Sequence, residues 1–262
     1  MRAFEYQPPA TLADAVRAAG AGDAKVIAGG QSLLAVIKLG LASHATLVDL
    51  AGVPGLRRIE LGADALTLGA MATHAEVAAS AAVQQAVPAL AALAGQIGDR
   101  QVRHRGTLGG SLANNDPAAC YPAALLALDA TVHTDRRRIA AADFFVGFYQ
   151  TALAEDELIT AVSFPRPQRA GWAKFKQPAS RFALVGVFVA QSARGVRVAV
   201  TGAGPGVMRV PALEERLARD WSAAACDGAA VDAEGLNSDL HATAEYRAAL
   251  IPVLAARAVA AS

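Results

Sequence analysis

The stretch RGTLGGSLANNDP, residues 105–117, carries a glycine pair, Gly109-Gly110, followed by polar and turn-forming residues. A similar pair, Gly29-Gly30, lies in the stretch KVIAGGQSLL, residues 25–34. A glycine pair lets the backbone turn without a Cβ penalty and leaves N–H groups that can cradle an anion. Because a diphosphate needs several such donors, two loops of this kind predict a cofactor with two phosphates held between them.

The surroundings of each pair strengthen this interpretation but leave simpler ones open. An apolar run predicted to be a strand, residues 24–28, precedes the first pair, and a predicted helix, residues 33–39, follows it. Backbone N–H groups can therefore converge on a phosphate at a positive helix end, although a tight connection remains the alternative. Four polar side chains follow the second pair within six positions: Ser111, Asn114, Asn115 and Asp116. A polar surface loop is the alternative there. Neither pair has the spacing of a Walker motif or of a nicotinamide-binding turn.

The charge and cysteine content exclude several classes of protein. The chain has 262 residues and a formal net charge of +1, which argues against a nucleic-acid partner. The basic run Arg136-Arg137-Arg138 is predicted to be a solvated turn between strands. Two cysteines, Cys120 and Cys226, cannot hold a four-cysteine iron–sulfur or zinc site, and the five histidines show no metal-ligand spacing. We therefore expect no metal site in this chain.

The sequence also predicts the cellular compartment of the protein. The N-terminal residues lack the apolar stretch of a signal peptide, and no apolar run approaches membrane-spanning length. With only two cysteines, a reducing cytoplasm is the expected compartment, without an integral membrane segment.

Hydrophobic periodicity divides the chain into three predicted parts. Residues 1–55 alternate helix and strand, as in a small α/β unit, and Thr11 is placed to cap the first helix. Residues 56–167 mix short strands and helices, with a hairpin expected over 56–69 and a capping box of Thr73 and Glu76 at the start of a helix. The stretch 166–171 is the best linker candidate because it contains Pro167 and Gly171 and directly follows Pro165. Residues 168–262 are predicted to form a small sheet backed by helices. The strands expected there are 172–177, 183–191 and 196–201, and the helices are 210–217, 242–250 and 252–260.

Taken together, these motifs resemble the medium, flavin-binding subunit of molybdenum hydroxylases, the family of aerobic carbon monoxide dehydrogenase and xanthine dehydrogenase. The resemblance covers nearly the whole chain, including KFK at 174–176, PASRFALVGV at 178–187 and LNSDLHATAEYR at 236–247. It implies an α+β, two-subdomain FAD-binding fold (PCMH-type, vanillyl-alcohol-oxidase-like), followed by a C-terminal flavoprotein domain.

The resemblance also implies the cofactor, FAD, and the residues that would contact it. The two glycine motifs would hold the diphosphate and nearby flavin, Ile97 and Ile159 would make apolar contacts, and Lys176 would lie near the flavin ring. The residues carried over in this way are Val26, Ile27, Ala28, Gly29, Gly30, Gln31, Ser32, Leu33, Ile97, Thr107, Leu108, Gly109, Gly110, Ser111, Asn115, Asp116, Cys120, Ile159 and Lys176. No residue of the chain is expected to act as a catalytic nucleophile or base.

One position departs from the family pattern. Members of this family often carry Asp where this chain has Cys120, and that carboxylate can bind the adenosine ribose. A thiol is a poor hydrogen-bond acceptor, so we expect a modest loss of ribose contact here.

By this resemblance, the chain is the electron-transfer subunit of an oxidoreductase. It would act with a large molybdopterin subunit and a small subunit holding two [2Fe–2S] clusters, as a dimer of heterotrimers. Electrons would pass from those clusters through FAD to an external acceptor. Three alternatives stay open at this point: a free-standing FAD-dependent oxidoreductase, a structural subunit without flavin and, more remotely, a nucleotide-binding regulator.

Overall fold

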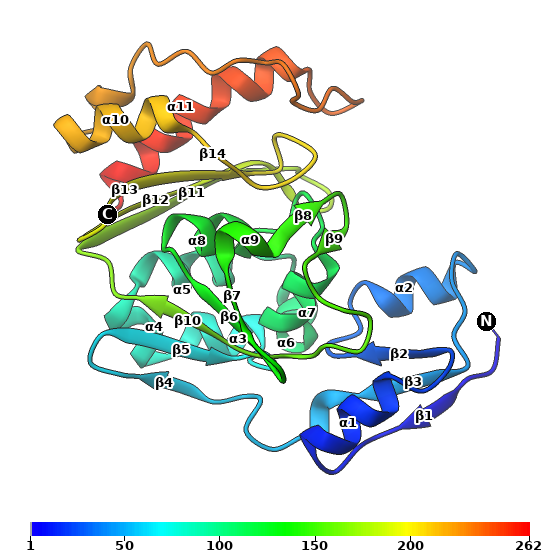
Figure 1. The fold of residues 1–262 in the computed structure, drawn as a ribbon. Coiled ribbons are helices and arrows are strands. Elements are labelled where there is room, and N and C mark those ends of the chain that lie inside the picture. Colours follow the sequence, from blue (N-terminus) through cyan, green and yellow to red (C-terminus); the bar gives the residue numbers. More distant parts are fainter. Residues whose placement is uncertain (1) are drawn as a thin grey trace.

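Three main β-sheets follow one another along the chain in the structure, a computed structural model that describes residues 2–262 (Figure 1). The first sheet is parallel, with strands β1 (Glu5–Gln7), β3 (Thr46–Asp49) and β2 (Ala24–Ile27) in that spatial order. Helices α1 (Leu12–Ala19) and α2 (Leu33–Lys38) connect these strands. Because β2 ends at Ile27, the chain passes directly from this sheet into the first glycine pair.

The second sheet is antiparallel and has five strands. In spatial order they are β4 (Ile59–Leu61), β5 (Ala65–Gly69), β10 (Ile159–Pro165), β6 (Thr131–Thr134) and β7 (Arg138–Ala140). The hairpin expected from residues 56–69 is confirmed, since Ile59 pairs with Leu68 and Leu61 with Leu66. Strand β10 enters between β5 and β6 from far along the chain, so residues on both sides of the second glycine pair share one sheet.

Seven helices and a small hairpin lie within this middle part. They are α3 (His74–Ala79), α4 (Ala81–Ala86), α5 (Pro88–Gly95), α6 (Arg100–Arg105), α7 (Leu108–Asn114), α8 (Tyr121–Ala127) and α9 (Ala141–Phe144), with strands β8 (Phe145–Gly147) and β9 (Gln150–Thr151). The predicted capping box of Thr73 and Glu76 starts α3. The main core lies between these helices and the second sheet and contains Tyr121, Phe144 and Phe164, all fully buried.

The third sheet consists of β11 (Arg169–Lys176), β12 (Ala183–Ser192), β13 (Gly195–Thr201) and β14 (Met208–Arg209). Helices α10 (Pro211–Arg219) and α11 (Ala244–Ala260) cover one face, and α8 packs on the other (Figure 1). Trp172 and Phe188 reach from this sheet into the main core, so the third sheet and the middle part share one apolar interior. Two short 3₁₀ turns complete the element list, at Leu50–Gly52 and Ala224–Cys226. The α+β class is confirmed, while the domain limits stay a prediction.

Two expectations about the C-terminal part are wrong. The predicted linker is already structured from Arg169, where β11 begins, because Gly171 packs against α11: a Cβ at Gly171 would overlap the carbonyl oxygen of Ala258. The two predicted C-terminal helices form the single helix α11, with Pro252 inside it. Burial of residues such as Ile251 and Leu254 on one face offsets the backbone hydrogen bond that proline cannot make.

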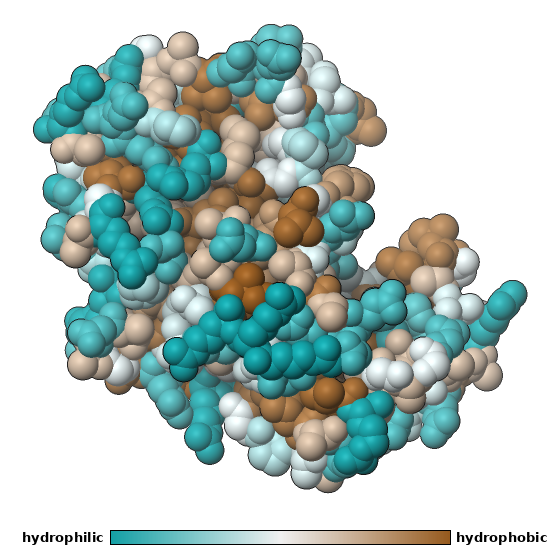
Figure 2. Space-filling model, in the orientation of Figure 1, coloured by the Kyte–Doolittle hydropathy of each residue, from teal (hydrophilic) through white to brown (hydrophobic). Residues whose placement is uncertain are grey.

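The hydropathy of the surface is mixed, and the space-filling view shows a notch where the lobe carrying α2 meets the rest of the molecule (Figure 2). From residue 2 to the end of the chain, none of the helices combines the length and the apolar character that crossing a membrane would demand.

Candidate cofactor site

The structure brings the two glycine motifs side by side. A Cβ at Gly29 would overlap the carbonyl oxygen of Arg105 and lie 2.8 Å from the Cα of Gly106. A Cβ at Gly110 would lie 3.4 Å from the Cβ of Ala28. Only a residue without a side chain permits the approach at Gly29, so this glycine joins the first motif to the segment that leads into the second.

The first glycine pair forms a loop whose backbone donors are free. Gly30 has a φ of +72°, in the left-handed region, and the loop then enters α2. Within residues 2–262, the N–H groups of residues 29–33 have no acceptor, and Ser32 makes no side-chain cap to the helix. These donors are what an anion requires, and they lie at the positive end of α2. The donor-rich loop expected at this position is therefore present.

The second pair differs from the expectation, because it lies in the first turn of α7 rather than in a loop. Its N–H groups already have protein acceptors: Gly109 donates to Ala70 O at 2.7 Å and Gly110 to Thr107 Oγ1 at 3.1 Å. Close packing against Ala70 explains why position 109 is a glycine, since a Cβ at Gly109 would lie 2.7 Å from Ala70 Cβ. The signal that the sequence offered for a helix was Thr107, an N-cap residue three positions before Gly110.

The polar side chains after α7 are also engaged by the protein. Asn115 ends the helix with a φ of +43° and donates through Nδ2 to the carbonyls of Gly147, at 3.0 Å, and Gln150, at 2.7 Å. Asp116 accepts hydrogen bonds from Ala118 N at 2.8 Å and from Tyr149 OH at 3.0 Å. The two residues thus hold the β8–β9 hairpin against the segment that follows the second glycine pair.

Burial and the neighbouring Asp116 carboxylate raise the pKa of Tyr149 to about 12. The phenol therefore stays protonated and continues to donate to Asp116 over the physiological pH range.

Cys120 is buried and lies beside a lysine that the sequence analysis did not single out. Lys174 Nζ lies 3.4 Å from Cys120 Sγ and donates to Gln96 O at 3.0 Å. Burial raises the pKa of Cys120, with the neighbouring ammonium opposing that effect. Lys176, the predicted flavin neighbour, is exposed at the end of β11. The alternation of a strand could have indicated that Lys174 and Lys176 share a face, the same face as Trp172.

The apolar residues of the prediction lie on several different elements. Ile27 is buried between the first sheet and α2, and Leu108 is buried in the main core. Ile97 is half-buried in the turn between α5 and α6, where Arg103 binds its carbonyl oxygen at 3.0 Å. Ile159 is buried at the start of β10. The remaining predicted residues are half-buried or exposed around the first glycine loop and α7: Val26, Ala28, Gln31, Ser32, Leu33 and Ser111.

A buried histidine supports the segment between the two motifs. His74 Nδ1 lies 3.3 Å from Tyr121 OH, and a Cβ at Gly106 would lie 2.6 Å from His74 Nε2. Burial, helped by the charge of Arg103, lowers the pKa of His74 to about 4. The imidazole is therefore neutral near pH 7 and fills space beneath Gly106 as an uncharged ring. Sequence spacing gave no signal for this contact.

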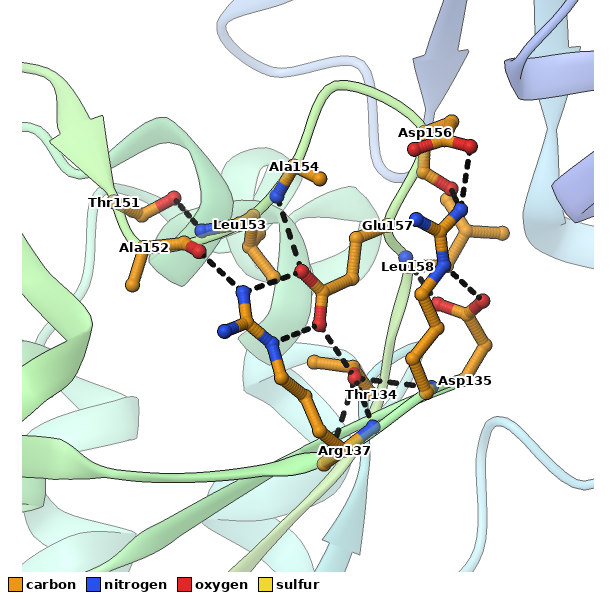
Figure 3. A network of polar contacts seen from close by, with 11 residues as sticks. Thr134, Asp135, Arg137, Thr151, Ala152, Leu153, Ala154, Asp156, Glu157 and Leu158 are labelled. Carbon is orange, nitrogen blue, oxygen red and sulfur yellow. Dashed lines mark hydrogen bonds and ion pairs between the residues drawn. The ribbon is translucent and has the colours of Figure 1, made fainter.

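A polar network anchors the loop that leads to Ile159 (Figure 3). Glu157 accepts from Thr134 Oγ1 at 2.8 Å and from Ala154 N at 3.0 Å, and Arg137 binds both of its carboxylate oxygens, at 2.9 and 2.8 Å. The Arg137 guanidinium is the main cause that lowers the pKa of Glu157 to about 2. Arg136 and Arg137 thus lie in a turn between strands, as expected, and are paired to acidic residues, while Arg138 begins β7.

Comparison with known proteins identifies the family. The model of the FAD binding domain in molybdopterin dehydrogenase matches residues 2–167, which is more than half of the chain. The chain belongs to this family. Its cofactor is therefore FAD, and its relatives are oxidoreductases.

Similar proteins cover nearly the full length of this FAD-binding chain. The nicotine 6-hydroxylase medium subunit of Paenarthrobacter nicotinovorans is 40% identical, over 98% of this chain and 96% of its own. The carbon monoxide dehydrogenase medium chain of Hydrogenophaga pseudoflava is 34% identical over the same shares. These likenesses make the chain an FAD-binding medium subunit of the molybdenum hydroxylase type.

Solved structures agree with the sequence comparison. The carbon monoxide dehydrogenase structure from Hydrogenophaga pseudoflava has a TM-score of 0.88 and 33% identity, covering 99% of this chain and 97% of that one. Quinoline 2-oxidoreductase from Pseudomonas putida 86 has a TM-score of 0.89 and 31% identity, covering 99% and 96%.

The site of this FAD-binding subunit fits a phosphate-bearing cofactor on its own geometry. The free N–H groups of residues 29–33 supply anion donors, and the adjacent α7 supplies a wall without charged side chains. Among residues 2–262, no group of three or more His, Cys, Asp or Glu side chains is placed to hold a metal ion.

Proposed function

We propose that the chain carries electrons from the [2Fe–2S] clusters of a small partner subunit, through FAD, to an external acceptor. The observation that supports this most directly is the loop at residues 29–33, whose free donors lie beside the Arg105–Gly106 backbone in a family that binds FAD. When bound, FAD exchanges electrons one or two at a time, which lets it connect one-electron clusters with a two-electron acceptor.

The residues of the chain hold and orient the cofactor in this proposal. Donors from Gly29 to Leu33 bind the diphosphate, and the wall formed by Thr107 to Ser111 closes the other side. Ile97 and Ile159 shield the adenine or flavin from water, and Cys120 lies at the ribose. Lys176 provides a cation near the flavin ring, where reduced flavin carries negative charge.

The partners in this proposal are a large molybdopterin subunit and a small subunit with two [2Fe–2S] clusters, assembled as a dimer of heterotrimers. The chain's own cysteines support this division, because Cys120 and Cys226 are free and buried, and two thiols cannot hold such clusters. The names of similar proteins, medium subunits and medium chains, also support it. A cytoplasmic location completes the proposal, since the two cysteines form no disulfide.

Anaerobic reduction of the flavin tests the electron route. The purified full chain is mixed with candidate substrates alone, and then with reduced small iron–sulfur subunit, while the flavin absorbance is followed. We expect the flavin to stay oxidised with substrates alone and to be reduced when the iron–sulfur subunit is added. Reduction by a substrate without any partner would instead establish a free-standing oxidoreductase, and a chain that purifies without flavin would overturn the proposal.

Replacement of Gly29 tests the loop. Gly29→Ala puts a Cβ onto the carbonyl oxygen of Arg105, so we expect loss of most bound FAD and about 2 kcal/mol of folding free energy. Gly52→Ala is the matched control, because a Cβ at Gly52 has no neighbour within 4 Å. FAD content by absorbance and urea unfolding are the measurements. Equal FAD content in the two variants would show that the loop does not hold the cofactor.

A further inference from the structure

A lysine outside the predicted set of cofactor contacts connects two parts of the candidate site. Lys174 lies on β11 and is half-buried. Its Nζ donates to Gln96 O at 3.0 Å, next to Ile97, and lies 3.4 Å from Cys120 Sγ. Because Ile97 and Cys120 are both predicted cofactor contacts, this ammonium lies between two residues of the site.

The protein gives this ammonium only weak partners. An ammonium has three N–H donors, and among residues 2–262 Lys174 has a carbonyl oxygen and a thiol as acceptors. Burial raises the pKa of the Cys120 thiol, so the sulfur is neutral and accepts weakly. Across the sheet, Lys174 pairs with Gly186 of β12, which has no side chain to bind it. One N–H of the ammonium is therefore left for water or a ligand.

The carboxylate near the thiol is engaged by other groups. The charge of Asp116 contributes to the raised pKa of Cys120. Its oxygens accept from Ala118 N at 2.8 Å and from Tyr149 OH at 3.0 Å. Within residues 2–262, no carboxylate forms an ion pair with Lys174. The ammonium is thus held beside Cys120 without a counter-ion from the described part of the chain.

Three cations from different segments converge on the turn between α5 and α6. Arg103 donates to Ile97 O at 3.0 Å and to Gly98 O at 3.1 Å, and Arg181 approaches Gly98 O at 3.5 Å. Lys174 binds the carbonyl before them. Cations commonly satisfy the carbonyls at a helix C-terminus, which carries about half a negative charge. Three full charges exceed that, so the turn favours a ligand rich in acceptor oxygens.

We propose that Lys174 binds the ribose in the adenosine half of FAD and takes over the contact for which a thiol at position 120 is poorly suited. Ribose hydroxyls accept hydrogen bonds from an ammonium, and such charge-assisted bonds are strong. The Nζ atom lies 3.4 Å from the sulfur of Cys120, so a ribose that reaches Cys120 also reaches Lys174. The inference rests on the proposed function, because that function places Cys120 at the ribose.

The second lysine of β11 has a different role in this arrangement. Lys176 is exposed at the end of the strand, whereas Lys174 is half-buried two residues earlier. Residues two apart on a strand are separated by about 7 Å, so the two ammonium groups reach different parts of one extended cofactor. Lys174 therefore contacts the adenosine half, and Lys176 keeps the flavin half that the proposed function gives it.

Titration of the FAD-free full chain with three ligands tests the assignment. FAD contains both halves, ADP contains the adenosine half with its diphosphate, and FMN contains the flavin half without the ribose. We expect Lys174→Met, which keeps the length of the side chain, to weaken FAD and ADP about tenfold and to change FMN by less than about twofold. Lys176→Met is the matched control and should show the opposite pattern, with weaker FAD and FMN and unchanged ADP.

Two further variants separate a ligand contact from a structural role. Lys174→Arg keeps the charge and the donors and should retain most of the affinity for FAD, whereas Lys174→Gln should repeat the pattern of Lys174→Met and replaces it if that variant does not fold. Unchanged FAD affinity in both neutral variants, or equal weakening of FAD and FMN, would overturn the inference. Because the titrations need no electron transfer, an electron route that fails with FAD still bound contradicts the proposed function and leaves this result readable.

Discussion

Cys120 lies where side chains from two parts of the chain meet. Its Sγ is buried beside Lys174 Nζ, and this ammonium has Gln96 O as its other protein partner at 3.0 Å. Since burial raises the pKa of the thiol, Lys174 faces a neutral sulfur rather than a negative charge. Because the partners of the half-buried Lys174 ammonium are a carbonyl oxygen and a neutral thiol, a stronger hydrogen-bond acceptor at position 120 would bind it more tightly.

Replacement of the thiol by a carboxylate tests this point. Cys120→Asp supplies an acceptor for Lys174 and for the ribose, so we expect FAD to bind about fivefold more tightly, equivalent to about 1 kcal/mol. Cys120→Asn, which has a similar shape and no charge, is the control and should gain less. Fluorescence titration of the FAD-free protein measures both affinities. An affinity that is unchanged or weaker in Cys120→Asp would refute the ribose role of this position.

At the scale of single elements, the loop before β10 depends on one buried carboxylate. Glu157 joins the β6–β7 turn to residues 152–158 through Thr134, Arg137 and Ala154 (Figure 3). Ile159 lies two residues after Glu157 and is the first residue of β10, so this network sets where that strand begins. The network therefore fixes a predicted cofactor contact without itself touching the glycine motifs.

The same carboxylate predicts an acid-sensitive contribution to stability. The pKa of Glu157 is lowered from 4.5 to about 2 in the folded chain. Its contribution is therefore complete above about pH 4.5 and is lost as the pH falls toward about 2. We expect Glu157→Gln to lower the folding free energy by about 2 kcal/mol near pH 7, a figure that allows for screening of the half-exposed Arg137.

Urea unfolding at several pH values measures this effect. The difference between the parent and Glu157→Gln should shrink below pH 4.5, where the carboxylate of the unfolded parent takes up a proton, and should be lost near pH 2, where the folded parent is protonated as well. Glu60→Gln is the control, because that carboxylate is 63% exposed and 3.7 Å from Arg58. A constant difference across the acid range would mean that shape, not charge, explains the role of Glu157.

Local signals predicted several elements correctly. The cap at Thr11, the capping box at Thr73 and the hairpin of β4 and β5 all follow from side chains within a few positions of one another. The expectations were wrong where contacts between residues far apart in the sequence determine the local structure. The second glycine pair is helical because Ala70 O and Thr107 Oγ1 accept its N–H groups. Helix α11 continues through Pro252 because its buried face packs on the third sheet.

At the scale of the whole molecule, one threonine ties the third sheet to the segment after α7. Thr201 is 1% exposed, and its hydroxyl donates to Ala119 O at 2.6 Å and lies 2.9 Å from Pro117 O, which accepts from Gly202 N at 2.8 Å. The C-terminal part therefore holds the backbone between Asp116 and Cys120, two residues of the predicted cofactor site.

Removal of the Thr201 hydroxyl is expected to weaken FAD binding. Thr201→Val keeps the shape of the side chain but leaves Ala119 O without this donor, so we expect a loss of about 1–2 kcal/mol of folding free energy and faster FAD release. Urea unfolding and the dissociation rate of FAD are the measurements. Thr131→Val, a half-buried strand residue elsewhere, is the control. An FAD dissociation rate equal to that of the control would show that the third sheet does not support the site.

Sequence motifs predicted the cofactor but only some of the contacts that form the site. The free donors at residues 29–33 and the proximity of the two motifs follow from glycine chemistry. Lys174 and His74 were not anticipated, because their partners, Cys120 and Gly106, are distant in sequence and meet only through packing. Periodicity also did not indicate the β8–β9 hairpin.

The two glycine motifs are prepared to different degrees before any cofactor arrives. The N–H groups around Gly109 are already bonded to Ala70, Ala72 and Thr107, whereas those of residues 29–33 are not bonded at all within residues 2–262. The protein itself thus orders the second motif, whereas we expect the N–H groups of the first motif to find their acceptors in the bound cofactor. A protease should therefore nick the FAD-free chain first near Gln31, and occupancy should shield that bond.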